Sequence, residues 1–314
     1  MAANKSNEIR ITRVYEAPVK AVWDAWTDPK QAAQWWGPRG FTITTHSKDL
    51  RPGGIWHYTM HGPDGTDYPN KTLYHEVEAG KRLVYDHGGN DERKPLFRVT
   101  VTFSEVKAGT KMEMTMTLPT PEEAEQTRKF IKQAGGNSTW DRLAEYLETD
   151  KDIFVINRSF DAPVETLYEM WTNPEHSSKW MPPTGFTMKY LRAHIKEGGS
   201  AFYSMTSENG KMTMYGRANY LKLRRPNEVV YTQQFCDAQE NVTRHPMAPT
   251  WPETMLTTVR FEAEGPNQAR ITIQWEPHGN ATPEELDTFR KARGGMTQGW
   301  TGSFDKLESA LEKS

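Results

Sequence analysis

Apolar and polar residues alternate near the start of the chain and again just past its midpoint. Ile9 and Ile11 alternate with polar neighbours, and this period of two predicts a half-buried strand over residues 8–15. A second such strand is predicted over residues 153–160. Each is followed by an Ala-Pro pair and then by apolar residues at helical spacing. Proline loses no hydrogen bond in the first turn of a helix, so each strand is expected to lead into a helix.

The stretch 13–41 recurs as the stretch 158–186. Ala-Pro-Val, Trp-Thr-x-Pro, a further Trp, a Pro and Gly-Phe follow in the same order, at a constant offset of 145 residues from Trp26 to Trp171. A gap-free repeat of this length indicates a duplication. Because each half of the 314 residues is long enough to bury its own core, we predict two domains, 1–149 and 150–314.

Short strands separated by Gly- and Pro-containing turns follow the helices of the first copy. They are predicted over residues 41–48, 55–61, 73–79, 82–87, 96–106 and 111–118. Thr120-Pro121-Glu122-Glu123 then begins a last helix, expected to run to about residue 148 and to be loosened at Gly135-Gly136. The second copy repeats this order with 13 additional residues near 237–253. The predicted fold class is therefore α+β, with two short helices, an antiparallel sheet and a long C-terminal helix in each half.

Composition limits the partners and the compartment. The chain has 39 basic and 41 acidic residues, a formal charge of −2, so no nucleic-acid partner is expected. The single Cys236 excludes an intramolecular disulfide and fits a reducing compartment. The N-terminal residues lack the apolar core of a signal peptide, and no apolar run has membrane-spanning length. We therefore expect a cytoplasmic protein without a membrane span.

Large apolar side chains are abundant for so polar a chain, with 11 Trp, 12 Tyr, 12 Phe and 14 Met. Met112, Met114 and Met116 share one strand face, where they either line a cavity or fill a core. The candidate ligand-binding residues are Trp36, Phe41, Trp56, Tyr58, Tyr74, Tyr85, Phe97, Met112, Met114 and Phe130 in the first half, and Met181, Phe186, Tyr203, Tyr215, Phe235, Trp275 and Trp300 in the second.

The sequence offers little support for a catalytic site or a metal site. His57 and His61 share a strand face about 13 Å apart, too far for one ion, so neither a metal nor a cofactor is expected. Glu76 and Glu78, on the same face as Tyr74 by alternation, serve either as general acid and base in a cavity or as a salt-bridged outer face. No Ser-His-Asp order, phosphate loop or dinucleotide fingerprint occurs, and no catalytic residue is assigned.

His245 lies in the additional segment of the second half. It either gates a cavity or belongs to a solvated loop.

The repeated motifs resemble those of one protein superfamily. They are Ala-Pro-x-x-x-Val/Leu-Trp/Tyr, Trp-Thr-x-Pro, the Trp-Trp-Gly-Pro of the first copy, a Gly-Gly turn and a closing Asp-Arg/Lys-Leu, and together they cover nearly the whole chain twice. In these the chain resembles the SRPBCC (START-like) superfamily, and more narrowly the branch homologous to the activator of the ninety-kilodalton heat-shock protein ATPase. The resemblance implies two tandem helix-grip domains, in which a curved sheet wraps the long helix and leaves an apolar cavity.

The two copies also differ at positions that bear on function. The second copy has Met181-Pro182 where the first has Trp36-Gly37, and the first copy lacks the Gly299-Trp300 of the second. These departures leave the implied fold intact and set the two implied cavities apart.

Three functions are compatible with the resemblance, because the superfamily includes lipid carriers, hormone receptors, aromatase/cyclases and chaperone activators. The favoured one is noncatalytic binding of a small apolar or aromatic ligand in one or both cavities, since the aromatic and Met surplus comes without a catalytic constellation. The alternatives are a chaperone-cofactor-like interaction module, which implies a chaperone partner, and a polyketide cyclase-like enzyme.

Overall fold

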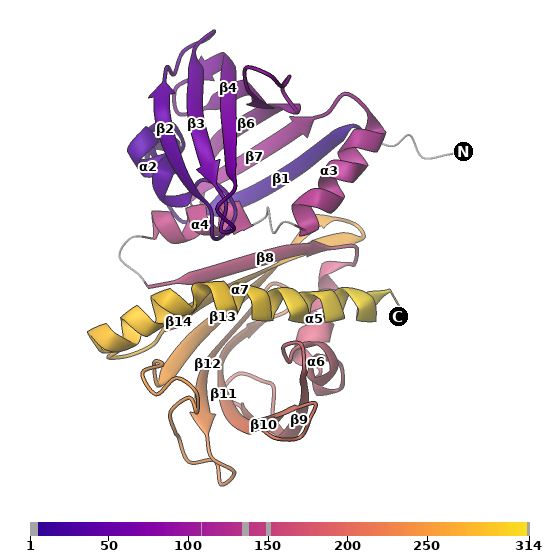
Figure 1. The fold of residues 1–314 in the computed structure, drawn as a ribbon. Coiled ribbons are helices and arrows are strands. Elements are labelled where there is room, and N and C mark those ends of the chain that lie inside the picture. Colours follow the sequence, from indigo (N-terminus) through magenta and orange to yellow (C-terminus); the bar gives the residue numbers. More distant parts are fainter. Residues whose placement is uncertain (1–5, 108, 134–137, 149–151, 313–314) are drawn as a thin grey trace. The chain divides into compact units, whose positions relative to one another are not determined.

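The structure is a computed structural model that describes residues 6–107, 109–133, 138–148 and 152–312. The chain falls into two compact units, Met1–Thr149 and Asp150–Ser314, called here the first and the second unit. Both have the same order of elements: a strand, two short helices, six further strands and helix at the C-terminal end (Figure 1).

The first unit consists of β1 (Glu8–Tyr15), α1 (Val19–Thr27), α2 (Pro29–Trp35), β2 (Thr42–Lys48), β3 (Ile55–His61), β4 (Asp67–Glu78), β5 (Arg82–Gly89), β6 (Phe97–Val106), β7 (Gly109–Thr117), α3 (Pro121–Gln133) and α4 (Ser138–Leu147). The second consists of β8 (Phe154–Phe160), α5 (Val164–Thr172), α6 (Pro174–Trp180), β9 (Phe186–Ala193), β10 (Ser200–Ser207), β11 (Thr213–Arg224), β12 (Glu228–Cys236), β13 (Thr254–Gly265), β14 (Gln268–Pro277) and α7 (Pro283–Leu311).

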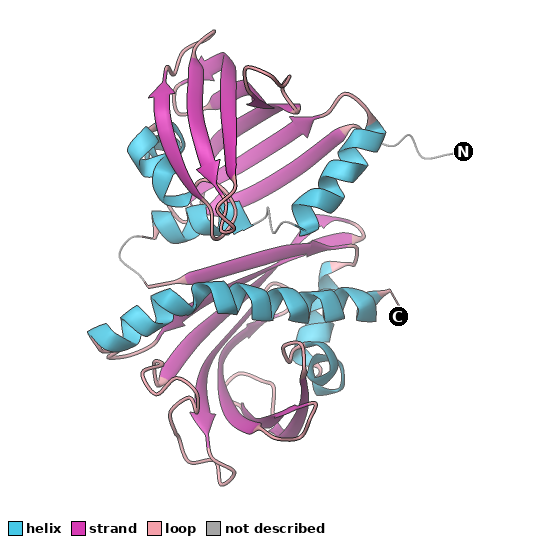
Figure 2. Cartoon of the chain, viewed as in Figure 1, coloured by secondary structure: helices cyan, strands magenta, loops and turns pink. Residues whose placement is uncertain are grey.

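Each unit has one seven-stranded antiparallel sheet. The strand orders are β1-β7-β6-β5-β4-β3-β2 and β8-β14-β13-β12-β11-β10-β9, so the first strand of each unit pairs with its last. Inward side chains alternate along the strands, as on β7, where Met112, Met114 and Met116 are buried. In the second unit one long helix runs across the sheet (Figure 2). The predicted α+β architecture is confirmed.

The repeated stretch builds the two short helices of each unit. Asp28 caps α2 by accepting hydrogen bonds from two backbone N–H groups of its first turn. Trp35 then fastens α2 to α1, because its indole N–H donates to the Ala25 carbonyl at 3.0 Å. Trp180 makes the same bond to Met170 at 2.9 Å in the second unit. Most of the repeat is therefore architectural.

The closing Asp-Arg/Lys-Leu motif supplies one cation to each unit. Arg142 donates to the carbonyls of Gly37 and Phe41 at 2.9 and 3.0 Å, where the chain leaves helix for sheet. Lys306 donates to the carbonyls of Pro182 and Pro183 at 2.9 and 3.1 Å. Burial lowers the pKa of Arg142 to about 10, and the carbonyl cluster still receives a charged donor at neutral pH.

One prediction for β4 is wrong. The pairing of β4 with β5 shifts register between Tyr74 and Glu76, and this bulge ends the simple alternation. Tyr74 is therefore buried while Glu76 and Glu78 are exposed and form ion pairs with Arg82 and Lys81. The two carboxylates belong to the outer face.

The two units differ most at their C-terminal helices. In the first unit the helix is described as α3 and α4, and Gly135-Gly136 lies outside the described residues. In the second unit α7 is one continuous helix of 29 residues that begins with a capping box at Thr282. The additional residues of the second unit form the loop 237–253 between β12 and β13.

Candidate functional site

The second unit contains a cavity of about 520 Å³. Its walls come from the inner face of the sheet, from α7, from the end of α6 and from the loop 237–253. Small-molecule sites typically measure about 300–1,000 Å³, so this volume suits a ligand of a few fused rings.

Two glycines on α7 create part of this space. Gly295 and Gly299 lie four residues apart, on one helix face, and both line the cavity. A Cβ atom at either position meets nothing within 4 Å. Because glycine within a helix costs about 1 kcal/mol relative to alanine, the pair gives up helix stability and leaves room above the sheet.

Tryptophan rings form the wall beside these glycines. Trp300 stacks on Trp171 with centroids 5.9 Å apart, and it meets Trp275 edge-on at 5.8 Å. The first copy lacks the Gly-Trp pair, yet Trp140 stacks on Trp26 at 5.6 Å in the corresponding place. When the two closing Asp-Arg/Lys-Leu motifs are aligned, Trp140 corresponds to Phe304, which lies one helical turn beyond Trp300. The missing Gly-Trp pair of the first copy is thus compensated by a tryptophan from the next turn.

Four tyrosines of the sheet form the opposite wall: Tyr190, Tyr203, Tyr220 and Tyr231. Burial raises the pKa of all four phenols, that of Tyr203 to about 12. They therefore remain protonated at neutral pH and combine apolar rings with hydrogen-bonding hydroxyls.

A polar group lies at the foot of this wall. The Trp275 indole N–H donates to Thr257 Oγ1 at 2.6 Å and to Gln233 Oε1 at 3.1 Å. Thr257 donates to the same Gln233 oxygen at 3.1 Å, and Gln233 Nε2 donates to the Tyr203 hydroxyl at 3.1 Å. Three neighbouring strands and β10 thus bring one hydrogen-bonded chain of side chains to the cavity.

Gly216 makes the position of Tyr203 possible. The two residues pair across β10 and β11, and a Cβ on Gly216 would lie 2.5 Å from the Tyr203 hydroxyl. The ring therefore lies over the bare backbone of the neighbouring strand, a place that only glycine leaves open.

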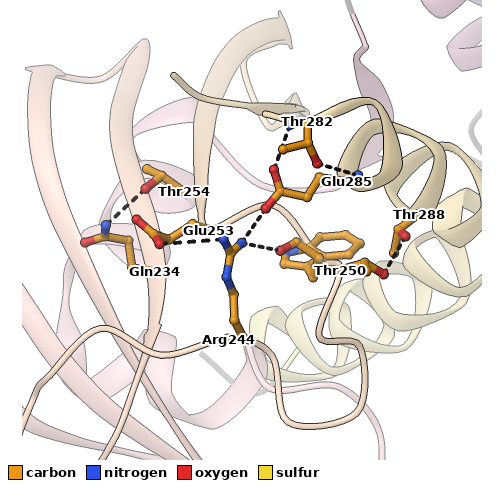
Figure 3. A network of polar contacts seen from close by, with 9 residues as sticks. Gln234, Arg244, Thr250, Glu253, Thr254, Thr282, Glu285 and Thr288 are labelled. Carbon is orange, nitrogen blue, oxygen red and sulfur yellow. Dashed lines mark hydrogen bonds and ion pairs between the residues drawn. The ribbon is translucent and has the colours of Figure 1, made fainter. Parts of the chain in front are cut away.

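The loop 237–253 contributes to the wall of the cavity. His245 and Trp251 line it, and burial lowers the pKa of His245. Arg244 fastens the loop to α7 by an ion pair with Glu285 and donates to the Trp251 carbonyl at 3.2 Å (Figure 3). Thr250 and Thr288 add a hydroxyl–hydroxyl bond of 2.8 Å (Figure 3). His245 is half-buried and lines the cavity, while residues 241–244, 246 and 247 beside it are exposed, so features of both interpretations are present.

The structure brings six of the predicted site residues together in this cavity. They are Met181, Tyr203, Tyr215, Phe235, Trp275 and Trp300. Phe186 is half-buried in β9 and is not among the lining residues.

The predicted residues of the first unit lie mostly in its core. Those that are buried are Trp36, Trp56, Tyr58, Tyr74, Tyr85, Met112 and Met114. The rings pack on one another, with centroids 5.0 Å apart for Trp36–Trp56 and 4.3 Å apart for Trp56–Tyr58. Phe41 and Phe97 are half-buried, and the side chain of Phe130 lies outside the described residues. These contacts favour the core interpretation for the first unit.

Sequence reasoning missed Gln233, Thr257 and Gly216. One signal was present for Thr257, which lies at an inward position of β13 between the buried Met255 and Val259. A polar residue in an apolar alternation indicates a hydrogen-bond partner inside.

Neither a metal-ligating cluster nor a membrane-spanning helix is found among the described residues. No group of three or more His, Cys, Asp or Glu side chains among them is placed to hold a metal ion. None of the helices in the described part is long and apolar enough to cross a membrane.

A curved antiparallel sheet closed by a C-terminal helix, repeated in tandem, defines a helix-grip protein. The chain belongs to the family described as Activator of Hsp90 ATPase homolog 1-like protein, whose sequence model matches residues 16–148 and 161–312. The resemblance drawn from the repeated motifs is thereby confirmed.

Several solved structures are similar to parts of this chain. A protein from Nitrosomonas europaea has 25% identity and a TM-score of 0.42, with 46% of this chain and 95% of that chain covered. A protein from Staphylococcus epidermidis has 27% identity and a TM-score of 0.42, with 48% and 95% covered. An AHSA1-like protein from Aeromonas hydrophila has 27% identity and a TM-score of 0.38, with 46% and 93% covered. No curated protein matches the chain.

Proposed function

We propose that the second unit binds a small apolar or aromatic ligand without transforming it. The observation that carries this proposal is the cavity of about 520 Å³ between α7 and the sheet, with Trp171, Trp275 and Trp300 around it. Burying apolar surface contributes about 25 cal/mol per Å², so a ligand that fills such a space gains affinity mainly by leaving water.

The chemistry of the lining supports binding over catalysis. Tyr203, with a pKa raised to about 12, is a hydrogen-bond donor at neutral pH and a poor base. Ser303 donates to the carbonyls of Met181 and Gly299 at 2.8 and 3.2 Å, which holds its hydroxyl away from nucleophilic work. Among the described lining residues, no hydrogen bond joins a nucleophile to a general base.

The chaperone-cofactor and cyclase-like functions rank lower. The proposal of a chaperone partner rests on the family description alone, which names the activation of a chaperone ATPase. The cavity, in contrast, is a feature of this chain. A cytoplasmic location stays a prediction.

Equilibrium dialysis of the full chain against fluorene, a planar aromatic hydrocarbon, tests the proposal. We expect one fluorene to bind per chain. Gly299→Leu should weaken binding at least tenfold, because the leucine enters the open space beside Gly299. Gly294→Leu is the matched control: Gly294 also has open space around it, but it is exposed and does not line the cavity.

Failure of fluorene and of other uncharged aromatic hydrocarbons to bind the wild-type chain would refute the proposed function. Equal binding by the wild type and both variants would place the ligand outside this cavity.

A further inference from the structure

The polar group at the foot of the cavity has one fixed orientation. An indole N–H only donates, and that of Trp275 lies 3.1 Å from one end of the Gln233 amide. This end must therefore be the oxygen, because the reverse orientation sets an NH₂ group against the indole N–H. In this orientation the same oxygen also accepts from Thr257, whose hydroxyl can donate or accept.

Fixing Gln233 also fixes the role of Tyr203. The Gln233 NH₂ group faces the Tyr203 hydroxyl at 3.1 Å and donates to its oxygen. The hydroxyl hydrogen of Tyr203 is then left over, and within the described part of the chain no acceptor for it lies in reach. Because Tyr203 lines the cavity, this hydrogen is offered to whatever occupies the space. A chain of donors thus runs from Trp275 through Gln233 to the ligand.

The charges around the cavity exclude another ligand class. Its described lining contains no Lys or Arg, and it includes the acidic Glu253. A carboxylate or phosphate group inside would have no counter-charge there, and burying an unpaired charge is costly. An anionic ligand therefore does not fit this lining.

The duplicated first unit lacks this arrangement. Tyr58 matches Tyr203 at the offset of 145, but the cross-strand pair Thr257–Trp275 corresponds to the apolar pair Val99–Met116. Gln233, which pairs with Met255, corresponds to a histidine that pairs with Phe97. The polar group is thus a property of the second unit and not of the shared architecture.

We propose that the cavity of the second unit selects uncharged aromatic ketones, with the ligand carbonyl accepting a hydrogen bond from Tyr203. This inference rests on the proposed function and adds the chemical class of its ligand. Gly216 is a positioning residue in this account, because it keeps the Tyr203 hydroxyl at the cavity wall.

Three probes on one ring skeleton test the inference by equilibrium dialysis: fluorene, fluorenone and fluorene carboxylate. We expect the wild-type chain to bind fluorenone about threefold to tenfold more tightly than fluorene, as one hydrogen bond predicts, and the carboxylate most weakly. Tyr203→Phe should abolish the preference for fluorenone over fluorene. Tyr58→Phe, the matched change in the first unit, should alter neither.

Infrared spectroscopy detects the hydrogen bond itself, because the carbonyl stretching frequency of fluorenone responds to a hydrogen-bond donor and not to packing alone. The carbonyl stretch of bound fluorenone should shift to lower frequency in the wild type, and the shift should be lost in Tyr203→Phe. The inference is overturned if fluorene binds as tightly as fluorenone, or if the carbonyl stretch of bound fluorenone has the same frequency in Tyr203→Phe as in the wild type. Either result leaves the proposed function standing. If none of the three probes binds, the proposed function fails, and this inference fails with it.

Discussion

Replacing Gly299 by leucine tests whether the space beside this residue can accommodate a side chain. The leucine should stabilise the chain, although most point substitutions destabilise a protein. The first contribution is helix propensity, because glycine costs about 1 kcal/mol more than leucine within a helix. The second is burial, because a Cβ at this position meets nothing within 4 Å and the side chain extends over the Trp300 wall.

The size of the effect follows from these two contributions. Burying a leucine stabilises by about 1.5–3 kcal/mol. Ordering its rotamers costs about 0.5–1 kcal/mol. Together with propensity, Gly299→Leu should raise the free energy of unfolding by about 1.5–3.5 kcal/mol. Gly294→Leu gains only propensity, about 1 kcal/mol, because Gly294 is exposed.

Urea unfolding followed by tryptophan fluorescence measures both variants against the wild type. The difference between them should be about 0.5–2.5 kcal/mol in favour of Gly299→Leu. If Gly299→Leu is instead less stable than Gly294→Leu by about 1–3 kcal/mol, the leucine is overpacked and the space is not there. That result would refute the reasoning about the glycine pair.

The remaining predictions concern the core, the tyrosine wall and the loop. Trp171→Ala should lower the free energy of unfolding by about 3–5 kcal/mol in urea denaturation, since Trp171 is 3% exposed, and a small loss would contradict its place in the core. Gly216→Ala should displace the Tyr203 hydroxyl and weaken fluorenone binding more than fluorene binding in dialysis; equal weakening would speak against the positioning role. The Thr282 backbone N–H and Arg244 hold the pKa of Glu285 below its ordinary value of 4.5, so its stabilising contribution is present above that pH and is lost as pH falls through the lowered pKa. Glu285→Gln should therefore reduce the loss of stability between pH 7 and about pH 3, measured by urea unfolding, and an unchanged pH dependence would contradict this.

The architecture could be predicted because its signals are local. Asp28 caps a helix two residues away, and Trp35 bonds to a carbonyl ten residues away. Such contacts recur wherever the same short stretch recurs, and the duplication displayed them twice. The bulge between Tyr74 and Glu76 was missed because it depends on how β4 pairs with β5, which alternation within one strand does not specify.

The candidate site could be predicted only in part. Trp275 and Trp300 were found by their size and Tyr203 by its position on a strand. Gln233 meets Trp275 across 42 residues of sequence, and no local pattern announces that contact. The difference at Gly299-Trp300 was visible in the sequence, but whether it opens a cavity depends on which side chains pack around Gly299 in the fold.

A crystal structure of the full chain with fluorenone tests the central claim most directly. The account predicts one fluorenone in the cavity of the second unit, between α7 and the sheet, with its carbonyl oxygen within hydrogen-bond distance of the Tyr203 hydroxyl. An empty cavity at saturating fluorenone, or a ligand bound elsewhere on the chain, would contradict it.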